Sequence, residues 1–179
     1  MKKILILLLK LIGVLFIVGA IAVFAIIIKY RLELPNLQSM VEDYKPQMAT
    51  IIYDKNNNVV DTLSVEAREV VKLEDVSPYV KDAFLAIEDK QFYSHHGLNF
   101  KGIARAVITT FLKGRATQGG SSITQQLAKN AFLTPEKTFS RKVKEAILTY
   151  QIERTYTKDE ILERYLNEIY YGSGSYGIK

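Results

Sequence analysis

The feature that most constrains this chain is a long apolar run near its N-terminus. Residues 11–28 contain no charged side chain, and the apolar stretch begins at Ile4 with Lys10 as its only interruption. A helix needs about 20 predominantly apolar residues to cross the roughly 30 Å hydrocarbon core of a bilayer. We therefore predict a single transmembrane helix within residues 1–30.

A cleavable signal peptide is the alternative explanation of this run, because Ala20-Ile21-Ala22 has the small-x-small spacing of a cleavage site. The apolar residues continue to Ile28, whereas a signal peptide ends at its cleavage site, so an uncleaved anchor is favoured. Basic residues flank the run with a small excess before it: Lys2, Lys3 and Lys10 against Lys29 and Arg31. Since positive residues stay on the cytoplasmic side, we expect a cytoplasmic N-terminus and an external remainder.

Residues 31–75 are predicted to form a linker. A short amphipathic stretch around Leu37 suggests a brief helix, and two β-rich runs flank the sequence KNNN at 55–58. Asparagine tolerates the left-handed backbone of tight turns, so these runs predict a β-hairpin. Residues 69–73 are a candidate third strand.

Composition narrows the functional classes. The chain has no cysteine, which excludes a disulfide framework and a thiolate metal site, and its two histidines argue against zinc. With 24 basic and 19 acidic residues, the net charge is +5. Such an excess suits nucleic acid, anionic lipid headgroups or a pyrophosphate substrate, and charge alone does not choose among them.

A dense cluster of titratable and aromatic residues at 86–97 (AIEDKQFYSHHG) suggests a functional site. The helix before it is predicted to begin at Ser77-Pro78, a hydroxyl cap followed by proline, and its apolar positions recur at helical spacing. Glu88 then lies near the helix C-terminus, where the macrodipole and apolar neighbours both disfavour a negative charge. Such surroundings suit a general base. A solvated Glu-Asp pair at a helix end is the alternative.

The pattern E-D-x-x-F-x-x-H-x-G resembles the first motif of the peptidoglycan glycosyltransferases, the enzymes of glycosyltransferase family 51 found in class A penicillin-binding proteins and as monofunctional transglycosylases. Its positions are Glu88, Asp89, Phe92, His95 and Gly97. Three further motifs follow in the family's order. The resemblance implies a mainly α, lysozyme-like helical glycosyltransferase domain at residues 76–179, incomplete at its C-terminus, behind the transmembrane helix and the short β-hairpin linker.

Residues 119–130 (GGSSITQQLAKN) resemble the second motif. Two glycines leave the backbone free of side chains, and Ser121 or Ser122 can cap the following helix, whose N-terminus offers unpaired N–H groups to an anion. By itself a glycine-rich turn with a serine cap is commonplace. The resemblance implies a lipid-pyrophosphate site with these binding residues: Gly120, Ser121, Gln125, Gln126 and Lys129.

Residues 140–153 (SRKVKEAILTYQIE) match the third motif, R-K-x-x-E, in a helical stretch predicted to open at Thr134-Pro135. Glu145 shares a helical face with Arg141 and Lys142. An exposed salt-bridge ladder worth roughly a few tenths of a kcal/mol per pair is the alternative. The resemblance assigns Glu145 to the donor's pyrophosphate, directly or through Mg²⁺ or Mn²⁺, with these basic residues around it: Lys129, Lys137, Arg141 and Lys144.

Residues 157–179 resemble the fourth motif. Thr157 and Glu160 predict a capping box, and an apolar stripe predicts a core helix ending at Gly172, built from Ile161, Leu162, Tyr165, Leu166 and Ile169. The family continues with a fifth motif, whereas this chain stops at Lys179. Because part of the stripe would then lack cover, we expect the chain by itself to be inactive or nearly so. No transpeptidase signature such as S-x-x-K is present, so penicillin binding is not expected.

Two positions depart mildly from the family pattern. Asn99, the expected cap of a helix running to about Leu112, stands where the family usually has aspartate, and Ser122 stands where it usually has threonine.

The helix after Asn99 exposes basic and apolar residues together, which suits a membrane surface. A core-facing helix is the alternative, and the resemblance favours membrane contact.

The resemblance implies that the protein polymerises lipid II into β-1,4-linked glycan and releases undecaprenyl pyrophosphate during cell-wall biogenesis. Glu88 would be the general base and Glu145 would act at the pyrophosphate, while Asp89, also expected at the substrate, would support Glu88 or the fold. The expected partners are lipid II, the growing strand, the bacterial inner membrane and cell-wall synthesis proteins, with no nucleic acid. Two alternatives remain open: a non-catalytic membrane-anchored fragment that binds glycan or a partner, and a lysozyme-like hydrolase that uses one carboxyl as general acid.

Overall fold

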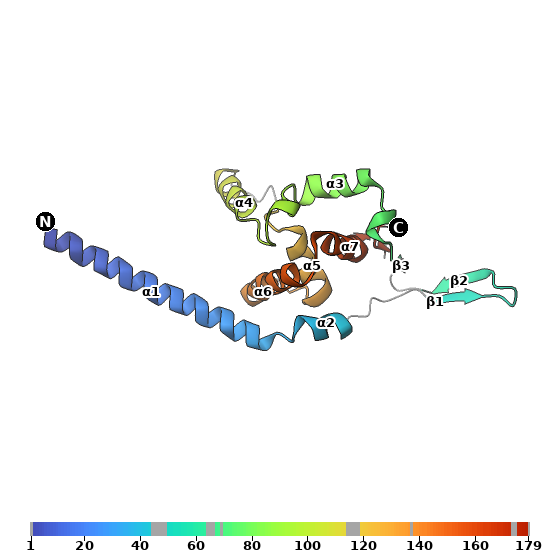
Figure 1. Cartoon of the computed structure of the whole chain (residues 1–179), viewed down its shortest axis with the longest axis horizontal. Helices are drawn as coiled ribbons and strands as arrows, with labels where there is room; N and C mark the ends of the chain where they lie inside the picture. Colours follow the sequence, from blue (N-terminus) through green and yellow to red (C-terminus); the bar gives the residue numbers. More distant parts are fainter. Residues whose placement is uncertain are drawn as a thin grey trace. The chain divides into compact units, whose positions relative to one another are not determined.

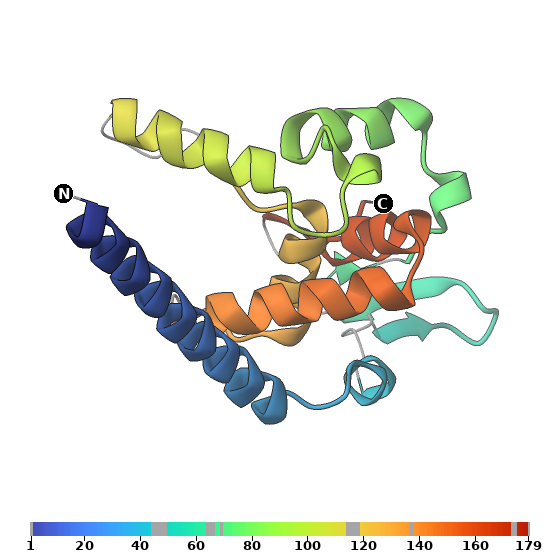
Figure 2. The same ribbon diagram turned by 60° about the vertical axis from the view of Figure 1, so that its left-hand side comes forward.

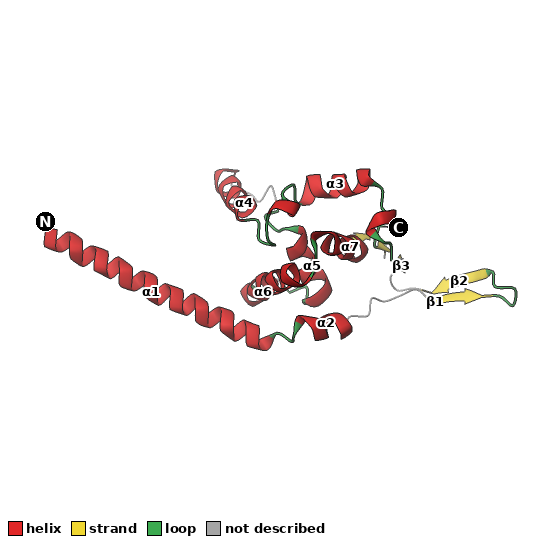
Figure 3. Ribbon diagram, viewed as in Figure 1, coloured by secondary structure: helices red, strands yellow, loops and turns green. Residues whose placement is uncertain are grey.

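The computed structural model is mainly helical, with two small groups of strands (Figure 3). It describes residues 2–43, 50–63, 67–68, 70–113, 119–136, 138–172 and 175–178. The chain divides into two units, Met1–Pro35 and Asn36–Lys179. The prediction of a mainly α fold is confirmed.

The first unit is built on one long helix, α1 (Lys2–Glu33), seen at the start of the chain in Figure 1. Within its stretch Leu9–Glu33, the most apolar 18 residues have a mean hydropathy of 3.2, and none of these is buried within the chain. Large apolar side chains such as Phe16, which is 77% exposed, therefore face outward. This helix is long and apolar enough to cross a membrane, as the sequence predicts.

The second unit begins with the short helix α2 (Leu37–Asp43) and the expected hairpin of β1 (Thr50–Tyr53) and β2 (Val59–Leu63). The strands pair antiparallel, with Ile52 opposite Asp61. In the turn, Asp54 accepts hydrogen bonds from the backbone N–H groups of Asn56 and Asn58, and Asn57 adopts the left-handed φ of 66°. The asparagine cluster therefore forms the turn as predicted.

The candidate third strand does not join this hairpin. Instead β3 (Ala67–Arg68) pairs parallel to β5 (Ser175–Tyr176), and β5 pairs antiparallel to β4 (Tyr170–Gly172). The following residues 70–72 are not a strand. The backbone N–H and C=O of Val71 bond to the side chain of Asn167, each at 2.8 Å, so a side-chain amide replaces the missing strand partner.

The helical body follows, preceded by a short 3₁₀ turn, η1 (Leu73–Asp75). It comprises α3 (Pro78–Glu88), η2 (Phe92–Ser94), α4 (Phe100–Lys113), α5 (Ile123–Phe132), α6 (Phe139–Thr155) and α7 (Lys158–Glu168). Helix α5 packs against both α6 and α7. Figures 1 and 2 show these three helices grouped together, with α3 and α4 on one side of the group.

Most helix caps agree with the sequence. Ser122 and Thr157 form complete capping boxes with Gln125 and Glu160, and Asn99 accepts a 2.7 Å hydrogen bond from the N–H of Gly102. Helix α3 begins at Pro78 behind Ser77, as predicted, although the Ser77 side chain makes no capping hydrogen bond. The expected start at Thr134-Pro135 is wrong, because α6 begins at Phe139 behind a Thr138 cap.

The core lies where α5, α6 and α7 meet. Its fully buried side chains include Ile123, Leu148, Ile152, Ile161, Leu162, Tyr165 and Leu166. The expectation that the α7 stripe lacks cover is therefore wrong, because Leu166 is 0% exposed within this chain. The helix also ends at Glu168, earlier than Gly172, which instead closes β4 with a φ of 100°.

Candidate active site

A cleft of about 630 Å³ opens beside the C-terminal end of α3. It is lined by the end of α3, the loop after it, parts of α4, and α5 with the segment before it. Six of the predicted site residues line this cleft: Glu88, Asp89, Gly120, Ser121, Gln126 and Lys129. The first and second motifs therefore meet in space, although about 30 residues separate them.

Glu88 is the last residue of α3, and its side chain is exposed at the cleft. The amide nitrogen of Gln126 donates a 2.7 Å hydrogen bond to its Oε2. The expected desolvation by apolar neighbours is wrong, since Ile87 is itself 81% exposed. What remains of the prediction is a carboxylate at a helix C-terminus, open to the cleft and oriented by one neutral donor.

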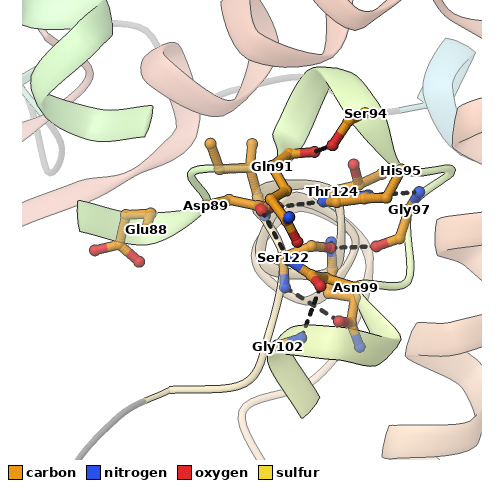
Figure 4. A network of polar contacts seen from close by, with 12 residues as sticks. Glu88, Asp89, Gln91, Ser94, His95, Gly97, Asn99, Gly102, Ser122 and Thr124 are labelled. Atoms are coloured by element: carbon orange, nitrogen blue, oxygen red, sulfur yellow. Dashed lines mark hydrogen bonds and ion pairs between the residues drawn. The ribbon is translucent and has the colours of Figure 1, made fainter. Parts of the chain in front are cut away.

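Asp89 has the opposite environment, as Figure 4 shows. It is 4% exposed and accepts hydrogen bonds from His95 Nε2 at 2.8 Å, from Asn99 Nδ2 at 3.3 Å and from the backbone N–H of Ile123 at 3.3 Å. His95 Nδ1 accepts from the N–H of Gly97 at 3.1 Å, so Nε2 carries the proton that points to Asp89. Asp89 therefore joins the loop after Glu88 to the first turn of α5.

Gly97 completes this connection. It has a φ of 86°, and its carbonyl accepts a short hydrogen bond from the Ser122 hydroxyl. A Cβ at this position would lie 2.6 Å from Thr149 Cγ2 and 2.9 Å from Glu153 Cγ. Both the backbone conformation and the close packing on α6 therefore require glycine here.

The N-terminus of α5 is largely occupied by the chain itself. The N–H of Ile123 donates to Asp89, and the N–H of Gln125 donates to the Ser122 hydroxyl at 3.2 Å. The anion site predicted at this helix end gains no support from these two donors. Ser121, beside them, accepts a 3.1 Å hydrogen bond from Lys142 Nζ.

Glu145 lies on α6, where it is 2% exposed and surrounded by donors. It accepts from Arg141 Nη1 at 3.2 Å, from Gln125 Nε2 at 3.2 Å and, over a shorter distance, from Lys142 Nζ. The Nε–H of Arg141 is buried and has no partner among the described residues. The exposed salt-bridge ladder is therefore not what the structure shows, because this carboxylate is buried among cations.

The remaining predicted residues lie in different places. Gln125 is 3% exposed and faces the interior, Lys129 is exposed at the cleft, and Lys144 is half-buried on α6. Lys137 lies outside the described residues. Lys142 is absent from the predicted binding residues, although its i,i+3 spacing to Glu145 is a signal for it. Lys90 and Arg105, which line the cleft, are also absent from them, since no local pattern indicates this.

The residues around Glu145 do not fit the expected Mg²⁺ or Mn²⁺. Both of its oxygens accept hydrogen bonds from cationic side chains. Within the described ranges, no group of three or more His, Cys, Asp or Glu side chains could hold a metal ion. Divalent cations of this kind prefer several oxygen ligands, which this donor set does not offer.

Comparisons with known proteins agree on one family. Residues 56–179 match the family model described as Transglycosylase. The chain is 51% identical over 128 residues to penicillin-binding protein 1F of Bacillus subtilis (strain 168), covering 72% of this chain and 18% of that protein. It is 43% identical over 179 residues to penicillin-binding protein 1A of Aquifex aeolicus (strain VF5), covering 100% of this chain and 24% of that protein. It is 44% identical over 164 residues to penicillin-binding protein 1A of Neisseria flavescens, covering 92% of this chain and 20% of that protein. The chain thus spans about a fifth of the length of these relatives.

Proposed function

The chain belongs to the transglycosylase family, and we propose that it is a membrane-anchored peptidoglycan glycosyltransferase that polymerises lipid II. In this reaction the 4-hydroxyl of an acceptor sugar attacks the anomeric carbon of the lipid-linked glycan. A β-1,4 bond forms, the bond to the pyrophosphate breaks, and undecaprenyl pyrophosphate leaves. Such an inverting displacement needs a base for the hydroxyl proton and positive charge near the leaving group.

The observation that carries this proposal is the state of Glu88. Its carboxylate is exposed at the cleft, and one oxygen is oriented by Gln126 at 2.7 Å. The other oxygen has no partner among the described residues, so it is available to accept a proton. We assign Glu88 as the general base.

Cationic side chains supply the second requirement. Lys90, Arg105 and Lys129 line the cleft, and Lys142 Nζ reaches Ser121 at its wall. In the cluster behind this wall, Glu145 holds the side chains of Arg141 and Lys142. We infer that Glu145 orients these cations and that the cleft cations contact the pyrophosphate. A chelation assay tests the expected Mg²⁺ or Mn²⁺, which the residues around Glu145 do not fit.

The proposed location follows from α1. A helix of this length and hydropathy anchors the protein in a membrane, and we place the N-terminus in the cytoplasm and the cleft outside the inner membrane, where lipid II is polymerised. Cell-wall synthesis proteins are the proposed partners.

The decisive experiment incubates lipid II with the protein expressed from its complete reading frame, next to the 179-residue chain, and analyses the products. Glycan polymer with release of undecaprenyl pyrophosphate supports the proposal. Shortened glycan strands from a preformed polymer would indicate a hydrolase, and binding without turnover would indicate a non-catalytic fragment. Either result overturns the proposed function.

A further inference from the structure

Gln126 lies between Glu88 and a second, buried residue. Its Nε2 is 2.7 Å from Glu88 Oε2, and its Oε1 is 3.5 Å from the hydroxyl of Tyr165 on α7. The two ends of one carboxamide thus contact two different elements, α3 and α7. Among the described residues, Gln126 is the hydrogen-bond partner of both.

The chemistry of these groups permits one orientation of the carboxamide. An ionised carboxylate only accepts hydrogen bonds, so the NH₂ end of Gln126 must face Glu88. The amide oxygen then faces Tyr165, whose hydroxyl is directed at it from 3.5 Å, the long limit of a hydrogen bond. Burial, together with the nearby charge of Glu88, raises the pKa of Tyr165, so the hydroxyl keeps its proton and remains a donor.

The ring of Tyr165 is fully buried in the core. It is 0% exposed, and it meets the ring of Phe84 edge-on at a centroid distance of 6.3 Å. Phe84 lies on α3 one turn before Glu88, on the same helical face. Tyr165 therefore contacts the helix that carries Glu88 and also the side chain that orients its carboxylate.

We propose that Tyr165 is a positioning residue for the glycosyl transfer, which acts through Gln126 to set the direction of the Glu88 carboxylate. This inference rests on the proposed function. The ring of Tyr165 belongs to the core, whereas its hydroxyl adds nothing to apolar packing. Its contribution is the fixed orientation of Gln126, which keeps the NH₂ end towards one oxygen of Glu88 and leaves the other oxygen for the acceptor hydroxyl.

The kinetic test uses Tyr165→Phe, which removes only the hydroxyl, in the protein expressed from its complete reading frame. We expect kcat to fall about threefold to tenfold, the loss of one neutral hydrogen bond, with KM for lipid II unchanged within about twofold. In a Gln126→Ala background the same change should have no further effect. An unchanged kcat, or an equal additional loss in the Gln126→Ala background, would overturn the proposal.

Tyr171 provides the matched control. It also meets Phe84 edge-on, at 6.1 Å, and it has no hydrogen-bond partner among the described residues. We expect Tyr171→Phe to leave kcat within about 1.5-fold, since no neutral hydrogen bond is lost. If both tyrosine variants lost the same activity and the same thermal stability, packing on Phe84 would explain the result and the proposal would fail.

A second measurement separates this inference from the proposed function. In protein labelled with ¹⁵N-glutamine, the carboxamide signal of Gln126 should shift in Glu88→Gln and in Tyr165→Phe but not in Tyr171→Phe. If the chemical shift of the Gln126 carboxamide is unchanged in Tyr165→Phe, the inference is overturned, whatever the activity of the variant. If the wild-type protein makes no polymer, the proposed function fails and the positioning role fails with it, while the shift still decides whether the contact exists.

Discussion

Glu88 and Glu145 are both held by glutamines of α5, yet their surroundings are opposite. Glu88 is exposed at the cleft and, among the residues that the structure describes, accepts one hydrogen bond, from Gln126. Glu145 is 2% exposed and accepts from Gln125 and from two cations. A carboxylate with an unpaired oxygen at a cleft can take a proton from a bound molecule. A carboxylate whose two oxygens both accept hydrogen bonds can instead fix the positions of its donors.

The difference arises from two adjacent positions on one helix. Successive side chains on an α-helix point about 100° apart, so Gln125 and Gln126 reach different sides of α5. Gln125 turns inward to the capping box and Glu145, and Gln126 turns to the cleft and Glu88. Helix geometry alone therefore directs two neighbouring glutamines of one motif to different places, one to the interior and one to the cleft.

The largest expected effect concerns the exposed member of the pair. Glu88→Gln should lower polymerisation about 100-fold or more, because general base catalysis typically contributes that much. The melting temperature should stay within about 1 °C, since surface substitutions rarely change stability by more than roughly 0.5 kcal/mol. Turnover on lipid II and a thermal melt check the two parts. A variant with near-normal turnover would show that Glu88 is an ordinary surface acid and not the general base.

Substitution of the buried Glu145 should change the stability of the protein, unlike substitution of Glu88. Glu145→Gln leaves Arg141 and Lys142 without their anion, so we expect the free energy of unfolding to fall by about 1.5 to 3 kcal/mol, with weaker use of the lipid-linked donor. Chemical denaturation and donor KM measure this. Glu136→Gln, an exposed acid before α6, is the control and should leave stability unchanged. Equal stability of both variants would argue that Glu145 is not the organising residue.

Lys129 tests whether the cations at the cleft bind the pyrophosphate of the donor. It is exposed and lines the cleft, so Lys129→Ala should weaken donor binding about tenfold through a lost charged contact, while the melting temperature stays constant. Lys72→Ala removes another exposed lysine, away from this cleft, and should leave donor binding unaltered. If the two lysine variants bound donor equally well, the cleft would not be the pyrophosphate site.

A third glutamate shows that exposure alone does not define a catalytic role. The backbone N–H and the hydroxyl of Thr157 hydrogen-bond to Glu160 at the start of α7 and lower its pKa from the ordinary value of 4.5. Because the folded pKa is the lower one, this contribution is present above pH 4.5 and is lost as the pH falls through the folded value. We expect wild-type protein to lose slightly more thermal stability than Glu160→Gln between about pH 5 and pH 3. If the melting temperatures of the two proteins fall equally over this pH range, the capping box of Thr157 and Glu160 makes no measurable contribution to stability.

Much of the fold could be predicted because its signals are local. The N-caps at Asn99, Ser122 and Thr157, the asparagine turn at 55–58 and the apolar spacing of α7 each involve residues a few positions apart. One local signal was misleading. Thr134-Pro135 resembles a helix start, but the chain places its cap at Thr138, four residues later.

The parts that could not be predicted depend on contacts between distant segments. The run at 69–73 has strand-like residues, yet its neighbour β3 pairs with β5 more than 100 residues away, and Val71 bonds to Asn167. Nothing near residue 70 in the sequence indicates either partner. Long-range pairing of this kind is decided by which surfaces remain uncovered once the helices have packed.

The apolar N-terminal helix, the helical class, the order of the motifs and the pairing of acids with cations could all be predicted from the sequence, because periodicity and i,i+4 spacing are properties of single elements. Only the tertiary structure decided that Asp89 and Glu145 are buried while Glu88 is exposed, since burial depends on the element that covers a residue. The same holds for the contact from Tyr165 through Gln126 to Glu88, which joins three helices whose residues lie up to 77 positions apart. Local spacing predicts which residues are candidates for the site, whereas the packing of distant helices determines the environment of each one.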